Sequence, residues 1–363
     1  MNNETKPQIV APGATIGIFG DGQLGRMLAV AASSLGYKTH SFGPQPDSPA
    51  SQVATAHTIA AYDDLEALNL FAQHVDVVTI EFENLPVESL ERLAQIVPVM
   101  PGPKILTICQ DRIQEKSFLE NLSIPVAPWC SVHNSESAIA AFTALGKRPS
   151  ILKSARLGYD GKGQAALQPE DDAGAAYIAL GQVPAVLEER IEFACEISVI
   201  VVRGQDGQMV CYPPSENQHK NGILDVSLVP AGVSADLAAK AEDLAKKIAE
   251  GLSLVGLLCV EMFVTKKGQL LVNELAPRPH NSGHWTLDGC VTSQFEQTIR
   301  AVCGLPFGSV ACFGKARMQN LIGDDILSWR KILDDANAKL HLYGKSEIKP
   351  GRKMGHVTWV TPR

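Results

Sequence analysis

Short apolar runs alternate with amphipathic stretches through the first hundred residues. Residues 15–19 and 76–80 are compact apolar-rich runs, which are typical of strands buried on both faces. The pattern predicts strands at 15–19, 37–42 and 76–80, and helices at 26–35, 64–73 and 87–95. Alternating strands and helices predict a parallel sheet with helices on its faces. The Pro-Gly-Pro run at 101–103 ends this first unit near residue 105.

The pattern changes in the rest of the chain. Helices at 105–121 and 135–145 and strands at 150–153 and 185–189 indicate a second mixed unit. From Cys195 onward, strands with hairpin turns predominate, and one long helix interrupts them. These strands are expected at 196–203, 208–212, 257–264 and 269–275, and the helix at 234–252. The tail, residues 314–363, is predicted to contain short strands and loops. A length of 363 residues allows two or three domains.

Composition narrows the class of protein. Lys and Arg number 32 against 39 Asp and Glu, a net charge of −7, so a nucleic acid is an unfavourable partner and any anionic substrate needs a local basic cluster. The eight cysteines form no Cys-x-x-Cys pair, which argues against zinc and against a disulfide framework. Residues 1–13 lack the apolar core of a signal peptide, and the longest apolar run, 252–260, is too short to span a membrane. We therefore expect a soluble, cytoplasmic protein with no membrane partner.

A first glycine loop, Gly20-x-Gly22-x-x-Gly25, lies between a predicted strand and a predicted helix. Backbone amides at such a turn can approach a phosphate group. A dinucleotide site also needs an acid at the end of the second strand, and the first acid there is Asp47, beyond two prolines. Three interpretations stay open: a different phosphorylated ligand, a tight turn without a ligand, and an NAD(P) site.

Two glutamates give the sharpest chemical signal. If the hairpin turns at Lys267-Gly268, Glu261 lies opposite Glu274. Directly opposed carboxylates among apolar neighbours are destabilising unless something compensates their charge. A divalent cation completed by nucleotide phosphates would do so, which predicts a Mg²⁺–ATP site. The alternatives are a different turn length that staggers the two acids, a solvated edge, and a pair acting as general acid and base.

A second glycine loop supports a nucleotide. Lys153 ends an apolar strand, and the loop 158–163 follows it closely. A strand lysine beside a flexible glycine loop suits a phosphate chain, although no Walker motif is present. Alone, such a loop is more often a surface hairpin.

Taken in order along the chain, these features resemble the ATP-grasp superfamily, which clamps ATP between two subdomains and activates a carboxylate as an acyl phosphate. The similarity covers almost the whole chain and extends to the branch that carboxylates 5-aminoimidazole ribonucleotide in purine biosynthesis. It is carried by five motifs: Gly22-Gln23-Leu24-Gly25-Arg26-Met27-Leu28, Gly158-Tyr159-Asp160-Gly161-Lys162-Gly163-Gln164, Asn273-Glu274-Leu275-Ala276-Pro277-Arg278, His280-Asn281-Ser282-Gly283-His284-Trp285 and Gly351-Arg352-Lys353-Met354-Gly355-His356.

The resemblance implies an α/β and α+β ATP-grasp fold. It implies an amino-terminal parallel-sheet domain at 1–105, an ATP-grasp domain at 106–310 with a lid at about 123–190, and a small β-rich domain at 311–363. It also implies ATP and Mg²⁺ as cofactors and a homodimer. The metal ligands would be Glu261 and Glu274.

The resemblance further implies a role for each matching residue. ATP contacts are expected from Arg112, Lys153, Gly158, Asp160, Gly161, Lys162, Gly163, Gln164, Glu188, Glu189, Arg190, Ile191, Glu196, His219, Asn273 and Glu274, with 188–191 as an adenine hinge read through its backbone. Substrate contacts are expected from Gly22, Gln23, Leu24, Arg278, Asn281, Ser282, Arg352 and Lys353. Independently of the resemblance, Glu81 and Glu83 follow the predicted strand at 76–80, at the end of a parallel strand where ligands bind. A contact to the substrate ribose and a solvated loop are both open for these two acids. The catalytic residues would be Tyr159, Asp160, Arg278 and Lys353.

The implied reaction is ATP-dependent carboxylation of 5-aminoimidazole ribonucleotide by bicarbonate through carboxyphosphate, which yields ADP and phosphate. One alternative is another ATP-grasp ligase, such as a formate-dependent glycinamide ribonucleotide ligase or a biotin carboxylase-like subunit. The others are an NAD(P)-dependent oxidoreductase and a nucleotide-binding module without catalysis.

Overall fold

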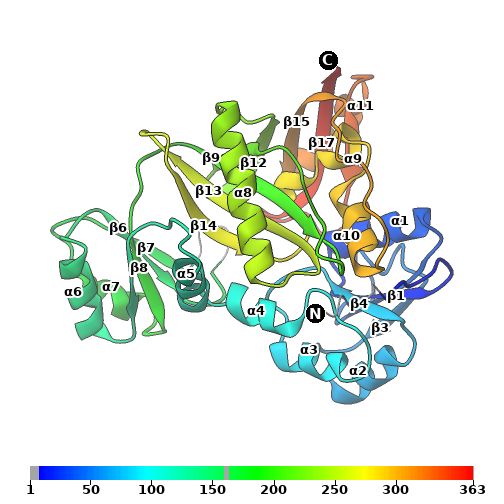
Figure 1. Ribbon diagram of the computed structural model, residues 1–363, viewed down its shortest axis with the longest axis horizontal. Coiled ribbons are helices and arrows are strands. Elements are labelled where there is room, and N and C mark those ends of the chain that lie inside the picture. Colours follow the sequence, from blue (N-terminus) through cyan, green and yellow to red (C-terminus); the bar gives the residue numbers. More distant parts are fainter. Residues whose placement is uncertain (1–7, 159–162, 363) are drawn as a thin grey trace, which may run out of the picture.

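The computed structural model describes residues 8–158 and 163–362. Within these residues, three β-sheets form, each with its own covering helices (Figure 1). The amino-terminal part forms a four-stranded parallel sheet and the middle a four-stranded antiparallel sheet. A nine-stranded antiparallel sheet occupies the rest. In Figure 1 the parallel sheet lies at the lower right and the small antiparallel sheet at the far left.

The amino-terminal sheet has the strand order β3-β2-β1-β4. Its elements are β1 (Thr15–Phe19), α1 (Gln23–Ser34), β2 (Lys38–Gly43), β3 (Ala56–Ile59), α2 (Leu65–Ala72), β4 (Val77–Ile80) and α3 (Val87–Ala94). The predicted parallel sheet is confirmed. Strand β3 was not predicted because it is a half-exposed edge strand without an apolar run. The carboxyl ends of β1 and β4 meet at one edge, where open α/β sheets bind ligands.

The small sheet has the order β5-β8-β6-β7. Its elements are β5 (Trp129–Val132), α6 (Ser135–Ala144), β6 (Ser150–Ser154), β7 (Gln164–Leu167), α7 (Ala173–Ala179) and β8 (Ala185–Glu189). One face packs Leu152 and Leu187 against Phe142 of α6. Because side chains alternate along a strand, Lys153 and Glu188 point to the opposite face.

The large sheet runs β14-β13-β9-β11-β12-β15-β17-β16, and β10 pairs with β9. Its strands are β9 (Phe193–Arg203), β10 (Met209–Cys211), β11 (Ser215–Lys220), β12 (Ile223–Val229), β13 (Gly256–Thr265), β14 (Leu270–Ala276), β15 (Gly314–Ile322), β16 (Lys339–Leu342) and β17 (Lys353–Pro362). The expectation of only short strands in the tail was wrong, because β15 has 9 residues and β17 has 10. These two strands continue the same sheet through β12.

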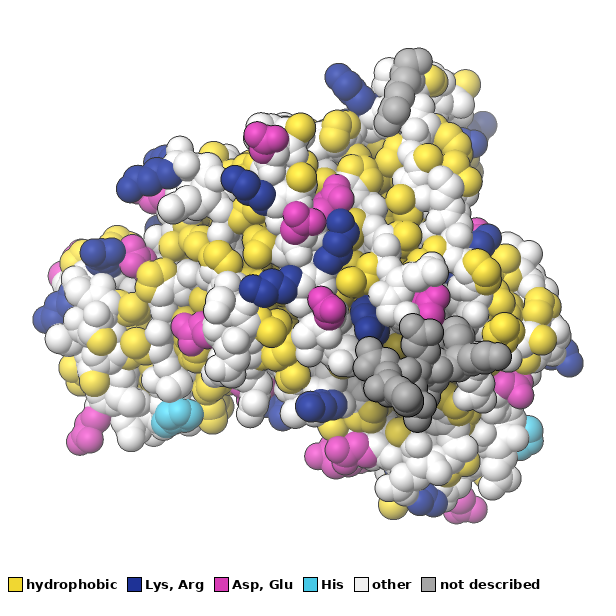
Figure 2. Space-filling model, viewed as in Figure 1, with side chains coloured by type: hydrophobic (Ala, Val, Ile, Leu, Met, Phe, Trp, Pro, Cys, Tyr) yellow, Lys and Arg dark blue, Asp and Glu magenta, His cyan; other side chains and the backbone are white. Residues whose placement is uncertain are grey.

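Side-chain alternation divides the large sheet into two faces. Val199 and Val201 pack with the long helix α8 (Ala235–Gly251), whereas Ile200 and Val202 pack with Trp285 on the other side. The helical segments that follow β14 and β15 are η1 (Asn281–Gly283), α9 (Thr286–Gly289), α10 (Gln294–Val302), η2 (Gly323–Ser328) and α11 (Trp329–Leu333). Basic and acidic side chains are interspersed over α8 (Figure 2). Across the described parts of the chain, no helix is both long and apolar enough for a membrane crossing.

The single helix predicted at 105–121 is two helices, α4 (Pro103–Cys109) and α5 (Arg112–Asn121). Asp111 causes the break, because its carboxylate accepts hydrogen bonds from the backbone amides of Ile113 and Gln114 and so caps a new helix. The break allows α5 to turn toward β14, which it contacts.

We predict that Asp111→Ala lowers the free energy of unfolding by about 1 kcal/mol, because the first turn of α5 loses its cap. Asp111→Asn keeps an accepting oxygen and should stay near the wild-type value. The midpoint of urea unfolding measures both variants. Equal destabilisation of the two would contradict a capping role.

Candidate active site

Glu261 on β13 and Glu274 on β14 are direct partners in the hairpin, so the predicted pairing is confirmed, although the register next to the turn differs by one from that of the assumed turn at Lys267-Gly268. The register reaches this pairing through a β-bulge. Nearer the turn, Val264 pairs with Leu270, and Asn273 then has no partner on β13. The extra residue shifts the register by one and leaves Asn273 and Glu274 both half-exposed. Without the bulge, Glu261 would face Asn273 instead.

Burial disfavours the charged form of both carboxylates. Burial and repulsion from Glu261 raise the pKa of Glu274. Burial acts on Glu261 too, but His280, whose Nε2 lies 3.0 Å from Glu261 Oε1, outweighs it and lowers the pKa of Glu261. The nearest guanidinium to Glu274 belongs to Arg112, at 4.0 Å. Two carboxylates on one sheet face with this little compensation fit a hard cation such as Mg²⁺, which prefers oxygen ligands.

A third acid, Glu115 on α5, supports the strand behind Glu274. Its Oε1 accepts a hydrogen bond of 2.8 Å from the backbone amide of Leu275. Burial raises the pKa of Glu115 to about 8. No sequence pattern signals this contact, because 160 positions separate its partners.

Lys153 belongs to a buried ionic cluster that the sequence revealed only in part. Its Nζ lies 3.0 Å from Glu188 Oε2, and Lys116 Nζ lies 3.2 Å from the other oxygen of Glu188. Burial opposes the charge of Glu188, but the two lysines outweigh it and lower the pKa of this acid. The Glu188 side chain therefore positions lysines, a role that the hinge interpretation did not include.

The rest of the expected hinge is partly engaged already. The backbone amide of Glu189 donates to Pro128 O, and that of Arg190 donates to Pro149 O. These two amides therefore cannot read an adenine ring in this arrangement, which corrects the expectation for them. Ile191 follows them in the link to β9.

The described ends of the second glycine loop lie beside these cations. Arg112 donates to the backbone carbonyls of Ser154 and Gly158. Gly163 has φ +67°, and a Cβ there would lie 2.7 Å from Ser154 Oγ. Gln164 begins β7. Four predicted site residues fall outside the described part of the chain: Tyr159, Asp160, Gly161 and Lys162.

Glu196 and His219 form a pair on the large sheet, with Nδ1 3.0 Å from Oε2. Burial opposes protonation of His219, but the hydrogen bond to Glu196 outweighs it and raises the pKa of His219. A shallow hollow is lined by Glu196 together with Ile197, Asn217, Glu261, Met262, Phe263 and Asn273. The predicted ribose acceptor, Glu196, and one member of the acid pair, Glu261, therefore line the same hollow.

The first glycine loop already holds an acid of the protein itself. Glu81 accepts hydrogen bonds from the amides of Gly22 at 2.7 Å and Gly25 at 2.8 Å. At Gly20, a Cβ would lie 2.1 Å from Glu81 Cγ, so the loop needs glycine for this close approach. Because these amides are occupied, the loop does not offer them to a dinucleotide phosphate.

Arg278 is held by an acid from the amino-terminal sheet. Its Nη2 donates to Glu83 Oε1 at 2.9 Å, and its Nε donates to the second oxygen of Glu83. Burial alone would raise the pKa of Glu83, but Arg278 lowers it from 4.5 to about 2. The sequence suggested that Glu83 follows a buried strand at a ligand edge, yet it could not reveal this partner.

The other expected substrate residues divide into accessible and buried ones. Gln23 begins α1 in a half-exposed position. The amide oxygen and nitrogen of Asn281 are buried, and neither has a hydrogen-bond partner among the described residues, so a polar ligand would reach them only after their surroundings move. Leu24 and Ser282 are 7% and 0% exposed, so their side chains cannot touch a ligand in this arrangement.

Arg352 and Lys353 belong to a basic cluster near the carboxyl-terminal strands. Its third member, Lys345, was not predicted from the sequence. Burial, with the neighbouring charges of Arg352 and Lys353, lowers the pKa of Lys345 to about 8. Glu81 also acts on Lys345 electrostatically, so this cluster faces the edge of the amino-terminal sheet. A lone lysine after a glycine belongs to no motif, so Lys345 could not be singled out from the sequence.

Family comparisons agree with this architecture. Residues 13–110 match the ribonucleotide synthetase preATP-grasp domain, 117–295 the ATP-grasp domain, and 316–363 the phosphoribosylaminoimidazole carboxylase C-terminal domain. The chain is thus an ATP-grasp protein, and the expected fold class is confirmed.

Individual relatives define the branch. The chain is 51% identical over 354 residues to an N5-carboxyaminoimidazole ribonucleotide synthase of Brucella melitensis, a match that covers 97% of this chain and 98% of the relative. An N5-carboxyaminoimidazole ribonucleotide synthetase solved as its ADP complex has a TM-score of 0.94 and 44% identity, over 98% of this chain and 94% of that one. The synthase of Aspergillus clavatus, solved with ADP and 5-aminoimidazole ribonucleotide, has a TM-score of 0.90 and 32% identity, over 96% and 94%.

The chain therefore belongs to the N5-carboxyaminoimidazole ribonucleotide synthase family and is an ATP-dependent ligase. The oxidoreductase alternative is wrong.

We predict that Glu83→Gln lowers the free energy of unfolding at pH 7 by about 3 kcal/mol. A pKa lowered from 4.5 to about 2 corresponds to about that much stabilisation of the folded state, and Arg278 loses its partner. A depressed acid stabilises above its unfolded pKa, so the difference from wild type should shrink as pH falls from 4.5 toward 2. Urea unfolding at several pH values measures it, with the exposed Glu91→Gln as control. A difference that persists unchanged at low pH would contradict the ion pair.

Proposed function

We propose that this protein carboxylates 5-aminoimidazole ribonucleotide with bicarbonate at the expense of ATP, in purine biosynthesis. The product is N5-carboxyaminoimidazole ribonucleotide, with ADP and phosphate. The observation that carries the proposal is that two groups of different chemistry lie close together. One is the acid pair Glu261 and Glu274, and the other is the set of anion-binding groups around Arg278. The relative solved with ADP and 5-aminoimidazole ribonucleotide supports the same pair of ligands.

At the nucleotide end, Arg112 and Lys153 would neutralise the phosphate chain. Glu261 and Glu274 would hold Mg²⁺, which when bound neutralises charge on the transferred phosphoryl group. Glu188 fixes Lys153 before ATP arrives, so the ammonium needs no reorganisation during phosphoryl transfer. The bulge leaves Asn273 and Glu274 both half-exposed, and Asn273 lines the hollow beside Glu261.

At the acceptor end, the chemistry needs an anion site and an amine. A bicarbonate oxygen attacks the γ-phosphorus of ATP, ADP leaves, and carboxyphosphate results. The amine then takes the carboxyl group, or CO₂ released from it, and phosphate leaves. Arg278 would bind the carboxylate species. The side-chain amide of Asn281, which has no hydrogen-bond partner among the described residues, would form hydrogen bonds with the ribonucleotide. Arg352 and Lys353, with Lys345, would receive the ribonucleotide phosphate.

Several further expectations belong to this proposal. Closure of the loop at 158–164 would keep water from carboxyphosphate, with Tyr159 and Asp160 near the reacting groups. The divisions near 105 and 310, the homodimer and the cytoplasmic location are retained with it, and the match to purine-biosynthesis relatives supports the location.

We predict that ADP release requires Mg²⁺, bicarbonate and 5-aminoimidazole ribonucleotide together. Glu274→Gln should lower kcat by at least about 100-fold, because a metal-binding charge is lost. Its unfolding midpoint should be no lower than that of the wild type, because the repulsion from Glu261 is removed. The exposed Glu250→Gln is the control. Turnover with glycinamide ribonucleotide and formate instead would identify the other ligase, and full activity of Glu274→Gln would refute the metal assignment.

We predict that Lys345→Met raises KM for the ribonucleotide about 10–100-fold and leaves KM for ATP nearly unchanged, because one charge-assisted contact to the phosphate is lost. In the wild type, KM for the ribonucleotide should rise as pH passes about 8, where Lys345 loses its proton. The variant should lack that rise. The exposed Lys349→Met serves as control, and equal effects on both KM values would contradict the assignment.

A further inference from the structure

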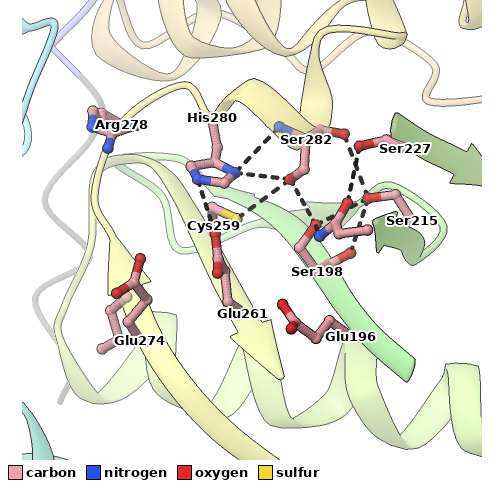
Figure 3. A network of polar contacts seen from close by, with 12 residues as sticks. Glu196, Ser198, Ser215, Ser227, Cys259, Glu261, Glu274, Arg278, His280 and Ser282 are labelled. Atoms are coloured by element: carbon pink, nitrogen blue, oxygen red, sulfur yellow. Dashed lines mark hydrogen bonds and ion pairs between the residues drawn. The ribbon is translucent and has the colours of Figure 1, made fainter. Parts of the chain in front are cut away.

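Three side chains of different chemistry converge beside the acid pair (Figure 3). Cys259 Sγ, a carboxylate oxygen of Glu261 and a ring nitrogen of His280 all lie within 4.8 Å of one another. Cys259 and Glu261 are two positions apart on β13, so both point to the sheet face away from α8. His280 comes from the segment that follows β14. The three therefore reach one point from two directions.

A buried hydroxyl network fixes the orientation of the histidine. Ser282 Oγ lies 2.8 Å from His280 Nδ1, which leaves Nε2 turned toward Glu261 at 3.0 Å. Ser198 Oγ lies 2.6 Å from Ser282 Oγ, and Asn217 donates to Ser198. A partner on the second ring nitrogen is the feature that orients metal-binding histidines in proteins. Cys259 has 0% exposure, and its Sγ lies 3.9 Å from Ser282 Oγ in the same network.

We propose that Cys259, Glu261 and His280 form an inhibitory site for a thiophilic divalent cation of the Zn²⁺ class. Sulfur, imidazole and carboxylate are the ligands that Zn²⁺ takes, and three protein ligands leave a fourth position for water. Mg²⁺ avoids sulfur, so the donor set separates this site from the proposed Mg²⁺ site. Binding releases the thiol proton of Cys259 and any proton on His280 Nε2 to solvent.

The two cation sites compete because they share Glu261. A thiophilic ion held by Cys259 and His280 would take Glu261 from its pairing with Glu274 and displace the charge arrangement of the hollow. Inhibition of turnover rests on the proposed function, whereas binding of the cation rests on the three side chains alone.

The binding test uses Co²⁺ as a spectroscopic probe of the full chain without nucleotide, under anaerobic conditions. The wild type should give a thiolate-to-cobalt charge-transfer band that saturates at one equivalent and disappears on addition of Zn²⁺. Cys195→Ala is the matched control, because that half-buried thiol lies on β9 and packs on the α8 side of the sheet. It should keep the band, and Cys259→Ala should lose it. A band that survives in Cys259→Ala overturns the site, and Cys259→Val replaces this variant if it does not fold.

The inhibition test follows ADP release at saturating Mg²⁺ and ATP while Zn²⁺ is added, with each variant compared to its own rate without Zn²⁺. The Zn²⁺ concentration for half-inhibition should rise at least about 10-fold in Cys259→Ala and stay unchanged in Cys195→Ala. Equal inhibition of all three chains overturns the inhibitory role. If no chain turns over while the cobalt band is present, the proposed function fails and the metal site stands.

Discussion

Two carboxylates held face to face in a hairpin are the constraint on which the rest of the site depends. An antiparallel pair normally avoids like charges in direct opposition. Here a one-residue bulge at Asn273 creates that opposition between Glu261 and Glu274. The hydrogen bonds of the β-ladder and the core beneath β13 keep the two carboxylates close despite their repulsion, because Val260 and Met262 are buried against α8 on the opposite face. A cation bound at this point would relieve the repulsion between the two carboxylates.

The same principle, an internal carboxylate fixing a binding group, recurs around the site. Glu188 holds Lys153, Glu83 holds Arg278, and Glu81 holds the amides of the first glycine loop. Each group is therefore oriented before a ligand arrives. The free energy needed to orient it is supplied by folding and not by ligand binding. The arrangement also limits what can bind. The amides that could accept a dinucleotide phosphate are occupied, whereas the buried amide of Asn281 has unmet hydrogen bonds.

The sheets bring together residues that no single segment supplies. The large sheet continues from the acid pair through β12 into β15 and β17, so the carboxyl-terminal strands are part of the same body as β13. Lys345 lies in the segment before β17 and interacts electrostatically with Glu81 of the amino-terminal sheet. Lys345 and Glu81 therefore come near each other only because the two ends of the chain pack together. The basic residues around Lys345 form a local positive cluster on a protein that is acidic as a whole.

The sequence by itself determined the elements with strong periodicity and the chemistry carried by neighbours. Alternating runs predicted the parallel sheet and the hairpin, because strand geometry has a fixed period of two. The pairing of Glu261 with Glu274 was predicted from an assumed turn at Lys267-Gly268, and it holds only because the bulge offsets the different register next to the turn. Only the tertiary structure decided the bulge that sets this register, the break at Asp111, and the partners of Glu81, Glu83 and Glu188. The cysteine spacings argued against a zinc site because they test only for ligands that are close together in the sequence. The Cys259 cluster escaped that test, since its ligands come from separate segments. Long-range contacts of this kind depend on packing, and packing leaves no pattern among adjacent residues.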